Sequence, residues 1–356
     1  MISSSFEGRR TGRGALFVGA SAVSAVVLPL AAWALPQLSV AADGGFCSAT
    51  ASAQHVACRA EGRDDFFVAK ANCTNVADAA ERDACLQEAL AARAEGARSC
   101  GEQLRARRAL CEQVGEARYD PDLDPADFDS DYTNLTHPNP FVPLTIGNRW
   151  EYDEDGDPVR IEILDSTKSI EGVTCIVVRD TVFANGSVHE DTDDWFAQAK
   201  NGDVWYFGEE VKDYETFPGD LPQAPELVSI DGSFKAGRDG AKPGIRFPAS
   251  PIVGQVYRQE FSPGNAEDAA EILTTTYAFG SNPELDQLVP QDLAELLCSD
   301  DCVVTKEGTP IEPDVIEIKY HAPGIGTFFE VNTTTGTKVQ LVDCNFDPRC
   351  AALPVP

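Results

Sequence analysis

The sequence predicts an α+β protein: a disulfide-stapled antiparallel helical hairpin followed by a mainly antiparallel β domain in the form of a barrel, half-barrel or sandwich. Six cysteines spaced symmetrically along an Ala-, Glu- and Arg-rich segment predict the hairpin. Many short strands, such as the one expected at Gly326–Asn332, are separated by Gly- and Pro-containing turns and predict the β domain, with one short helix around Pro290–Leu297. Strands and helices do not alternate and no GxGxxG or P-loop is present, so a nucleotide-binding α/β fold is not expected.

We expect four segments: a signal peptide at 1–42, the helical hairpin at 43–118, a solvated acidic linker rich in Pro and Asp at 119–140, and the β domain at 141–356. The first segment places three arginines before an apolar run and ends in small residues, as secretory signals do. The sequence therefore predicts export to the periplasm, the cell surface or the medium. It leaves open whether the first segment is cleaved or retained as an anchor.

The chain is strongly acidic, with 28 basic and 58 acidic residues and a formal net charge of −30. Nucleic acids and anionic membranes bind basic surfaces, so neither is an expected partner. The charge suits a well-solvated exported surface, and it is compatible with cation binding or with a basic partner.

Cysteine spacing in the hairpin segment is palindromic, C-x10-C-x14-C-x11-C-x14-C-x10-C. Two antiparallel helices that turn near residue 79 would place these cysteines opposite each other in pairs, near one seam. We therefore predict the nested disulfides Cys47–Cys111, Cys58–Cys100 and Cys73–Cys85. Their expected role is structural, because so small a segment buries little apolar core.

Five cysteines remain in the β domain. Cys344 and Cys350 bracket a short turn and are expected to pair. Cys302 can pair with Cys298 across a short loop or with Cys175 across the sheet. The odd count leaves one thiol free, either Cys175 or Cys298.

The segment 189–210, HEDTDDWFAQAKNGDVWYFGEE, predicts the β-hairpin that carries the candidate site. Its Asn201-Gly202 pair is typical of a two-residue type I′ turn, which needs positive φ at both positions. With that turn, one face of the hairpin carries the pairs Asp194/Glu209, Phe196/Phe207 and Gln198/Trp205. Two carboxylates placed opposite each other repel unless a proton, a cation or a basic group lies between them. Asp194 and Glu209 therefore mark the candidate site.

We interpret the aromatic side chains of this face as a pocket wall and expect a ligand- or cation-binding protein, with a small molecule, a glycan or a protein as partner. The predicted ligand-binding residues are Phe196, Gln198, Trp205, Phe207, Glu190 and Asp191. If a metal ion such as Ca²⁺ is bound, Asp194 and Glu209 are its predicted ligands.

Three alternatives stay open at this point. The acidic residues can form a structural salt-bridge network with basic side chains of later strands. Asp194 and Glu209 can act as acid and base of a glycosidase-like hydrolase, although binding is favoured over catalysis. The protein can also be purely structural and self-associate through the helical rod.

Several stretches together resemble a family of uncharacterised secreted bacterial proteins with a cysteine-containing helical segment in front of a β-rich domain. The stretches are NPFVPLTIGNRWEY, GVTCIVVRDT, EDTDDWFAQAKNGDVWYFGE, GAKPGI, YRQEFSPGNAED and KYHAPGIG. The resemblance implies bacterial export and a β-rich main domain, and it implies no activity. The sequence departs from the family pattern at Ala199, Ile318 and His321.

Overall fold

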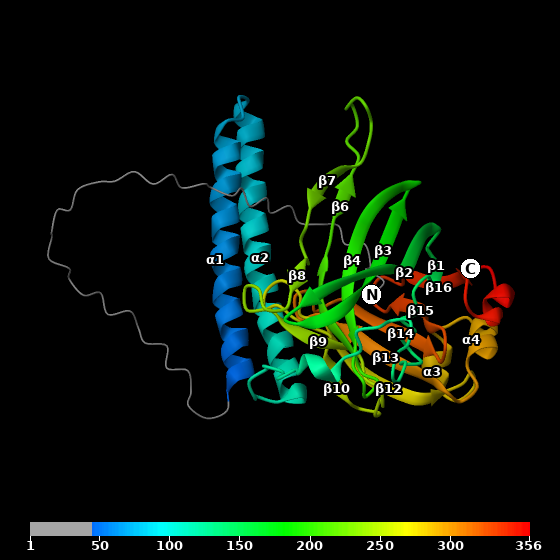
Figure 1. Ribbon diagram of the computed structural model, residues 1–356. Helices are drawn as coiled ribbons and strands as arrows, with labels where there is room; N and C mark the ends of the chain where they lie inside the picture. The colour runs from blue at the N-terminus through cyan, green and yellow to red at the C-terminus, as the bar shows by residue number, and fades with distance from the viewer. Residues whose placement is uncertain (1–44) are drawn as a thin grey trace.

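The computed structural model describes residues 45–356, and the predicted signal peptide lies outside them. Two long antiparallel helices, α1 (Phe46–Thr74) and α2 (Ala79–Val114), stand beside a large β domain (Figure 1). Within residues 45–356, no helix combines the length and apolar character needed to cross a membrane.

The three nested disulfides of the hairpin are confirmed. Cys47–Cys111, Cys58–Cys100 and Cys73–Cys85 link α1 to α2, with Cα–Cα distances of 5.6, 5.8 and 5.6 Å. These distances are typical of disulfides between neighbouring elements. The Asp78 carboxylate caps α2 by accepting hydrogen bonds from two backbone N–H groups of its first turn. The rod is therefore held by covalent links along its whole length.

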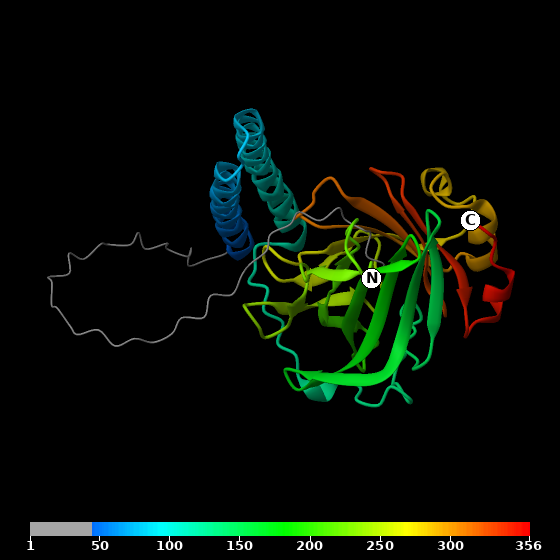
Figure 2. The same ribbon diagram turned by 90° about the horizontal axis from the view of Figure 1, so that it is seen from above.

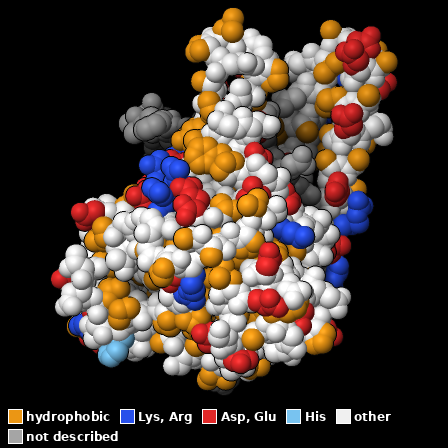
Figure 3. Space-filling view, turned by 90° about the vertical axis from the view of Figure 1, so that its right-hand side faces the viewer, with side chains coloured by type: hydrophobic (Ala, Val, Ile, Leu, Met, Phe, Trp, Pro, Cys, Tyr) orange, Lys and Arg blue, Asp and Glu red, His pale blue; other side chains and the backbone are white. Residues whose placement is uncertain are grey.

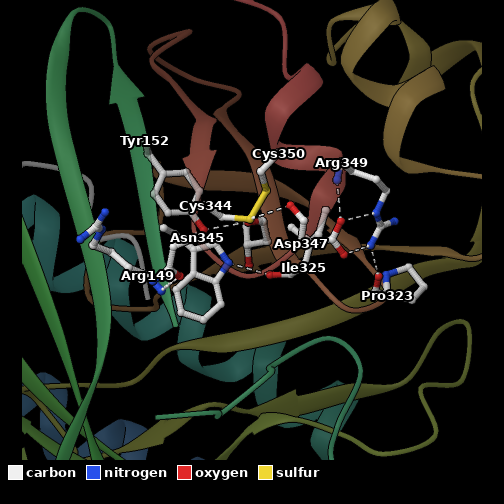
Figure 4. Close-up of a disulfide and its surroundings, with 11 residues drawn as sticks. Arg149, Tyr152, Pro323, Ile325, Cys344, Asn345, Asp347, Arg349 and Cys350 are labelled. Atoms are coloured by element: carbon white, nitrogen blue, oxygen red, sulfur yellow. Dashed lines mark hydrogen bonds and ion pairs between the residues drawn. A yellow bond between two sulfur atoms is a disulfide. The ribbon is translucent and has the colours of Figure 1, made fainter. Parts of the chain in front are cut away.

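The remaining cysteines follow one of the two predicted schemes. Cys298 pairs with Cys302, Cys344 pairs with Cys350, and Cys175 is a buried free thiol. The Cys344–Cys350 disulfide joins the end of the last strand to the 3₁₀ helix η2 (Pro348–Ala352) (Figure 4). Arg349 of η2 donates a hydrogen bond to the carbonyl oxygen of Pro323 at 2.7 Å, which fixes this C-terminal segment against the sheet.

The β domain is a mainly antiparallel, nearly closed barrel, as predicted. Its strands are β1 (Arg149–Glu154), β2 (Asp157–Ile170), β3 (Val173–Ala184), β4 (Ser187–Gln198), β5 (Val204–Glu210), β6 (Asp213–Glu215), β7 (Glu226–Ser229), β8 (Phe234–Lys235), β9 (Lys242–Phe247), β10 (Val256–Arg258), β11 (Glu260–Phe261), β12 (Ala269–Tyr277), β13 (Cys302–Gly308), β14 (Ile316–Ala322), β15 (Gly326–Asn332) and β16 (Lys338–Cys344).

Neighbouring strands pair in the order β10-β12-β13-β14-β15-β16-β1-β2-β3-β4-β5-β9-β11. The two ends of this path, β10 and β11, are consecutive pieces of the segment 256–261, so the path returns on itself. Seen from above, the strands curve around a common axis (Figure 2). The short strands β6 and β7 leave the barrel wall and form an arm of their own, and Figure 3 shows two projections rising from the body of the molecule.

The segment at 119–140 is not the solvated linker that we expected. It contains the 3₁₀ helix η1 (Pro125–Asp127), and Phe128 behind it is only 5% exposed. Phe128 packs edge-on against Phe207 of β5, with ring centroids 5.8 Å apart, and its backbone bridges to Ala199. Most acidic side chains of this segment are exposed, but Asp129 is buried and accepts hydrogen bonds from the backbone N–H and the hydroxyl of Thr136. The segment therefore covers the outer face of β3, β4 and β5.

Short helices cover the opposite part of the barrel wall. They are α3 (Pro283–Asp286) and α4 (Gln291–Leu297), and the second was predicted. Leu293 of α4 is fully buried, and the Tyr320 hydroxyl of β14 donates to the carbonyl oxygen of Leu285 at 2.7 Å. The outer face of β12–β16 thus packs under helices, and the inner face of the same strands carries charged side chains.

Candidate functional site

The turn between β4 and β5 differs from the predicted one. The backbone N–H of Ala199 donates to the carbonyl oxygen of Asp203, so three residues, 200–202, form the loop. Gly202 has a φ of 98°, whereas Asn201 does not have a positive φ. This is the three-residue hairpin loop that ends in a glycine, and it shifts the register by one residue relative to a type I′ turn. The Asn139 side chain, which donates to the carbonyl oxygen of Gly202, stabilises this loop from outside the hairpin.

A bulge on β5 then restores the predicted register. Gln198, Ala197 and Phe196 pair with Val204, Trp205 and Tyr206, but Asp194 pairs with Glu209. Two residues of β5, Phe207 and Gly208, therefore face the single residue Trp195 of β4. Gly208 has a φ of 133°, and any Cβ there would overlap the carbonyl oxygen of Phe234 in β8. The predicted position of Asp194 opposite Glu209 is confirmed, for a reason that the sequence did not show.

The predicted aromatic face is wrong. Because of the register shift, Phe196 lies opposite Tyr206, at a ring-centroid distance of 4.8 Å, and not opposite Phe207. Phe207 and Trp205 point to the outer face, where they pack with Trp195 and Phe128. Both faces of the hairpin are covered, so its aromatic residues are core and do not form an open pocket wall.

The other predicted ligand-binding residues also separate. Asp191 lies outside and forms a bidentate ion pair with Arg179, at 2.6 Å for each contact. Gln198 is fully buried, and its side-chain amide contacts neighbouring backbone groups, including the carbonyl oxygen of His137. Glu190 faces the interior, and the Thr192 hydroxyl donates to it at 2.9 Å. Of the predicted set, Glu190, Asp194, Phe196 and Glu209 therefore remain together.

The carboxylates of Asp194 and Glu209 share one hydroxyl. Tyr206, which is fully buried, lies within hydrogen-bond distance of Asp194 Oδ1 and, at 2.9 Å, of Glu209 Oε2. A phenol has a single proton and can donate to one carboxylate at a time. The second contact therefore requires a protonated carboxyl group that donates to the tyrosine oxygen.

Burial assigns that proton to Glu209. Burial, and then the charge of Asp194, raise the pKa of Glu209 well above its usual value. The pKa of Asp194 is raised as well, first by burial, while the hydrogen bond from Tyr206 acts in the opposite direction. A protonated Glu209, the Tyr206 hydroxyl and the Asp194 carboxylate therefore form a short hydrogen-bonded chain, which allows the two acidic groups to lie opposite each other.

Asp180 of β3 was not predicted and is the most isolated member of this interior cluster. It is 3% exposed, and neither of its carboxylate oxygens has a hydrogen-bond partner within residues 45–356. Burial, together with the charges of Glu190 and Asp194, raises its pKa well above the usual value. A signal for it existed in the sequence. Asp180 takes an inward position in the alternation of Ile176, Val178 and Val182, where an apolar residue is expected.

Strands β13, β14 and β15 add a second charged group on the same interior. Lys319, 3% exposed, contacts the carboxylates of Glu317 and Glu330 at 3.0 Å each and that of Glu307 at 3.4 Å. Burial acts to raise the pKa of Glu307, but Lys319, Arg246 and His321 outweigh it and lower that pKa to about 2. Burial raises the pKa of Glu330 to about 8. The positive charge of Lys319 therefore compensates mainly the negative charges of Glu307 and Glu317.

The two charged groups influence each other through the interior. Burial and then Glu317 raise the pKa of Asp268 to about 6, and Asp268 in turn helps to raise the pKa of Glu209. Further polar atoms in this interior lack hydrogen-bond partners among the described residues: Arg246 Nη1, the Tyr257 hydroxyl, both amide atoms of Gln259 and Asp194 Oδ2. Native interiors leave few such atoms unpaired. The barrel interior therefore combines excess carboxylates with unused hydrogen-bonding groups.

A hollow of about 210 Å³ lies at one end of this interior, lined by residues of the β1–β2 and β3–β4 hairpins. Its wall includes Glu154, Asp157, Val182 and His189. Glu154 is one of the charges that raise the pKa of Asp180, so the hollow borders the acidic cluster. Pockets for drug-sized ligands measure roughly 300–1,000 Å³, so this hollow suits a smaller molecule.

No preformed metal centre is found in the described part of the chain. Among residues 45–356, no three His, Cys, Asp or Glu side chains converge in the way that a bound metal ion needs. Ca²⁺ takes six to eight oxygen ligands. Asp194 and Glu209 are instead hydrogen-bonded through Tyr206, so this arrangement provides too few free oxygen ligands for a metal ion.

The comparisons with known proteins leave the function open. No protein-family profile and no curated protein matches the chain. Among solved structures, it is similar to a protein from Bacteroides fragilis described as a "putative exported protein with YmcC-like fold". The two have 14% sequence identity and a TM-score of 0.29, over 59% of this chain and 98% of the other. The site is therefore interpreted from its own geometry.

Cysteine usage indicates where the protein resides. Five disulfides engage ten of the eleven cysteines. Disulfides form and persist in oxidising compartments and are rare in the cytosol. The protein therefore belongs to an extracellular or periplasmic setting.

Proposed function

We propose that this exported protein binds a small cationic ligand, specifically an organic amine, at the acidic interior of the β domain. The observation that carries the proposal is the buried Asp180 carboxylate, whose two oxygens have no hydrogen-bond partner within residues 45–356. A buried carboxylate without a donor costs free energy of folding. A protonated amine brings a positive charge and up to three N–H donors, so it satisfies Asp180 and the unpartnered oxygen of Asp194 together.

An amine suits the geometry better than a metal ion does. Among the described residues the interior carboxylates do not converge on one point, and the adjoining hollow of about 210 Å³ accepts a few heavy atoms. The interior also holds the Gln259 amide and the Tyr257 hydroxyl, which can hydrogen-bond to a polar ligand. A metal ion needs several oxygens at fixed short distances, whereas an amine needs two or three acceptors.

Proton release is the expected signature of binding. Burial raises the pKa of Asp180 and Glu209 well above the usual value, so these two carboxyl groups hold protons in the free protein. A bound ammonium group favours their ionised forms and lowers these pKa values. The affinity should therefore rise with pH, and each binding event should release protons to the buffer.

The test is a titration of the exported, disulfide-bonded protein with ethylamine and putrescine, with ethanol as a neutral probe and CaCl₂ as a metal probe. Calorimetry in buffers of different ionisation enthalpy measures affinity and proton release together. We expect amine binding that Asp180→Asn and Asp194→Asn weaken at least tenfold. Asp165→Asn, an exposed carboxylate of β2, is the matched control and should bind as the unmodified protein does.

Two results would refute the proposal. One is the absence of amine binding at pH 8. The other is unchanged affinity in Asp180→Asn. Stabilisation by CaCl₂ alone, lost in Asp194→Asn, would instead support the metal-binding alternative.

The hydrolase alternative has one observation in its favour. The double contact of the Tyr206 hydroxyl requires one of the two carboxyl groups, Asp194 or Glu209, to hold a proton, and a glycosidase needs one protonated and one ionised carboxyl group. The Tyr206 hydroxyl, however, occupies the space between the two carboxyl groups, and Asp194 is only 1% exposed. Turnover of a polysaccharide panel that Glu209→Gln abolishes would favour catalysis over binding.

A further inference from the structure

A groove between the helical rod and the β domain forms a second candidate site, independent of the barrel interior. We call it the rod groove, and its volume is about 510 Å³, within the range of pockets for small molecules. Apolar and aromatic side chains from both parts of the molecule form its walls, among them Phe46, Leu110, Tyr119, Val256 and Phe261. The rod and the barrel must both be present for the groove to exist.

The charge of the rod groove is opposite to that of the whole chain. Its lining contains Arg107, Arg118 and Arg258 but only one acidic residue, Glu267. Arg107 donates hydrogen bonds to both carboxylate oxygens of Glu267, at 2.7 and 3.0 Å. The negative charge of Glu267 is therefore paired with Arg107. In a chain with a formal charge of −30, a groove with two further guanidinium groups is a local exception.

Arg258 of β10 forms no direct ion pair among residues 45–356, although the charge of nearby Glu267 acts on its guanidinium group. Its guanidinium lies 5.7 Å from the ring centroid of Tyr119 and 5.3 Å from that of Phe261, and it contacts the sulfur of Cys47 at 3.1 Å. It is half-buried, and burial lowers its pKa. A partly desolvated cation held on aromatic faces, with its N–H donors underused, favours a bound anion.

We propose that the rod groove binds an amphipathic anion, an unbranched aliphatic carboxylate, with the carboxylate at Arg258 and the alkyl chain between α1, α2 and the barrel wall. Arginine recognises carboxylates through paired N–H donors. The apolar walls on both sides bury the alkyl chain, which supplies affinity in proportion to the area removed from water. Arg118, whose guanidinium lies 4.9 Å from the ring centroid of Phe46, adds positive charge along the groove.

Octanoate is the probe, and octylamine and 1-octanol are its cationic and neutral counterparts. Calorimetry and thermal unfolding of the exported, disulfide-bonded protein measure binding. We expect saturable one-to-one binding of octanoate with a rise in Tm, and at least tenfold weaker binding of the other two probes. Arg258→Gln should weaken octanoate binding at least tenfold. Arg160→Gln, an exposed arginine of β2, should leave it unchanged.

Three results would overturn the proposal: no saturable binding of octanoate, equal affinity for octanoate and octanol, or unchanged octanoate affinity in Arg258→Gln. If Arg258→Gln does not fold, the comparison of octanoate with octylamine and octanol on the unmodified protein decides the question alone. Sodium chloride should weaken octanoate binding and leave octanol binding unchanged, because only the first depends on charge.

Discussion

Lys319 is the residue whose removal tests the charged interior most directly. Its ammonium group is 3% exposed and contacts three glutamates at 3.0, 3.0 and 3.4 Å. Lys319→Met keeps the length of the side chain and removes the charge. At pH 7 this leaves Glu307 and Glu317 without their cation, and breaking a buried ion pair by removing one partner costs about 3–5 kcal/mol.

The same change should cost less in acid. Without Lys319, the pKa of Glu307 rises from its present value of about 2, so this carboxyl takes up a proton at a higher pH and less buried charge remains in acid. We expect the loss of unfolding free energy to be smaller at pH 4.5 than at pH 7 by at least about 1.4 kcal/mol, the equivalent of one pH unit for one proton.

Urea unfolding followed by tryptophan fluorescence measures this effect. Three of the four tryptophans, Trp150, Trp195 and Trp205, lie in the β domain, and the fourth, Trp33, lies in the predicted signal peptide. In the exported protein without that segment, the signal reports on the domain that contains Lys319. Lys306→Met, an exposed lysine of β13, is the control and should change the unfolding free energy by less than about 0.5 kcal/mol. A cost below about 1 kcal/mol at pH 7, or the same cost at both pH values, would refute the view that Lys319 balances buried charge.

Two further predictions concern the titration of the interior and the bulge that positions the carboxylate pair. Burial raises the pKa of Glu330 from 4.5 to about 8, so its contribution to stability is present in full below pH 4.5 and is lost as the pH rises to 8. Glu330→Gln should therefore reduce the fall in unfolding free energy between pH 5 and 8 by up to about 1.4 kcal/mol per pH unit. Glu295→Gln, at an exposed position, is the control and should not change this fall. Parallel curves of unfolding free energy against pH for wild type and Glu330→Gln would contradict the prediction. Gly208→Ala should cost well over about 1 kcal/mol, because the φ of 133° and the Phe234 carbonyl both exclude a Cβ, whereas Gly254→Ala, with a φ of 81° and open space around it, should cost about 1 kcal/mol. Thermal unfolding of the two variants measures the difference, and equal losses would show that the contact between β5 and β8 yields to a methyl group.

Local chemistry was sufficient to predict much of the architecture. The hairpin disulfides follow from cysteine spacing, because a helix converts sequence distance into a direction around its axis. Strand positions such as Gly326–Asn332 and the helix α4 follow from short apolar runs and turn residues. The sequence also predicted that Asp194 lies opposite Glu209. This prediction is correct only because a longer loop and a bulge shift the strand register in opposite directions, so that the two shifts cancel at this pair.

Tertiary structure decided the composition of the site. Strand alternation indicates that Asp180 and Asp194 each point to one face of a strand, but only closure of the barrel brings these strands to a common interior with Lys319 and Glu330. Phe196 lies opposite Tyr206 and not opposite the predicted Phe207, and the contacts that accompany this shift come from outside the hairpin, at Asn139 and at Phe234. Local sequence determines secondary structure and disulfide geometry because these depend on nearby residues. Which side chains share an interior depends on how strands far apart in the sequence pair. The energy of that pairing depends on both strands and cannot be derived from either segment alone.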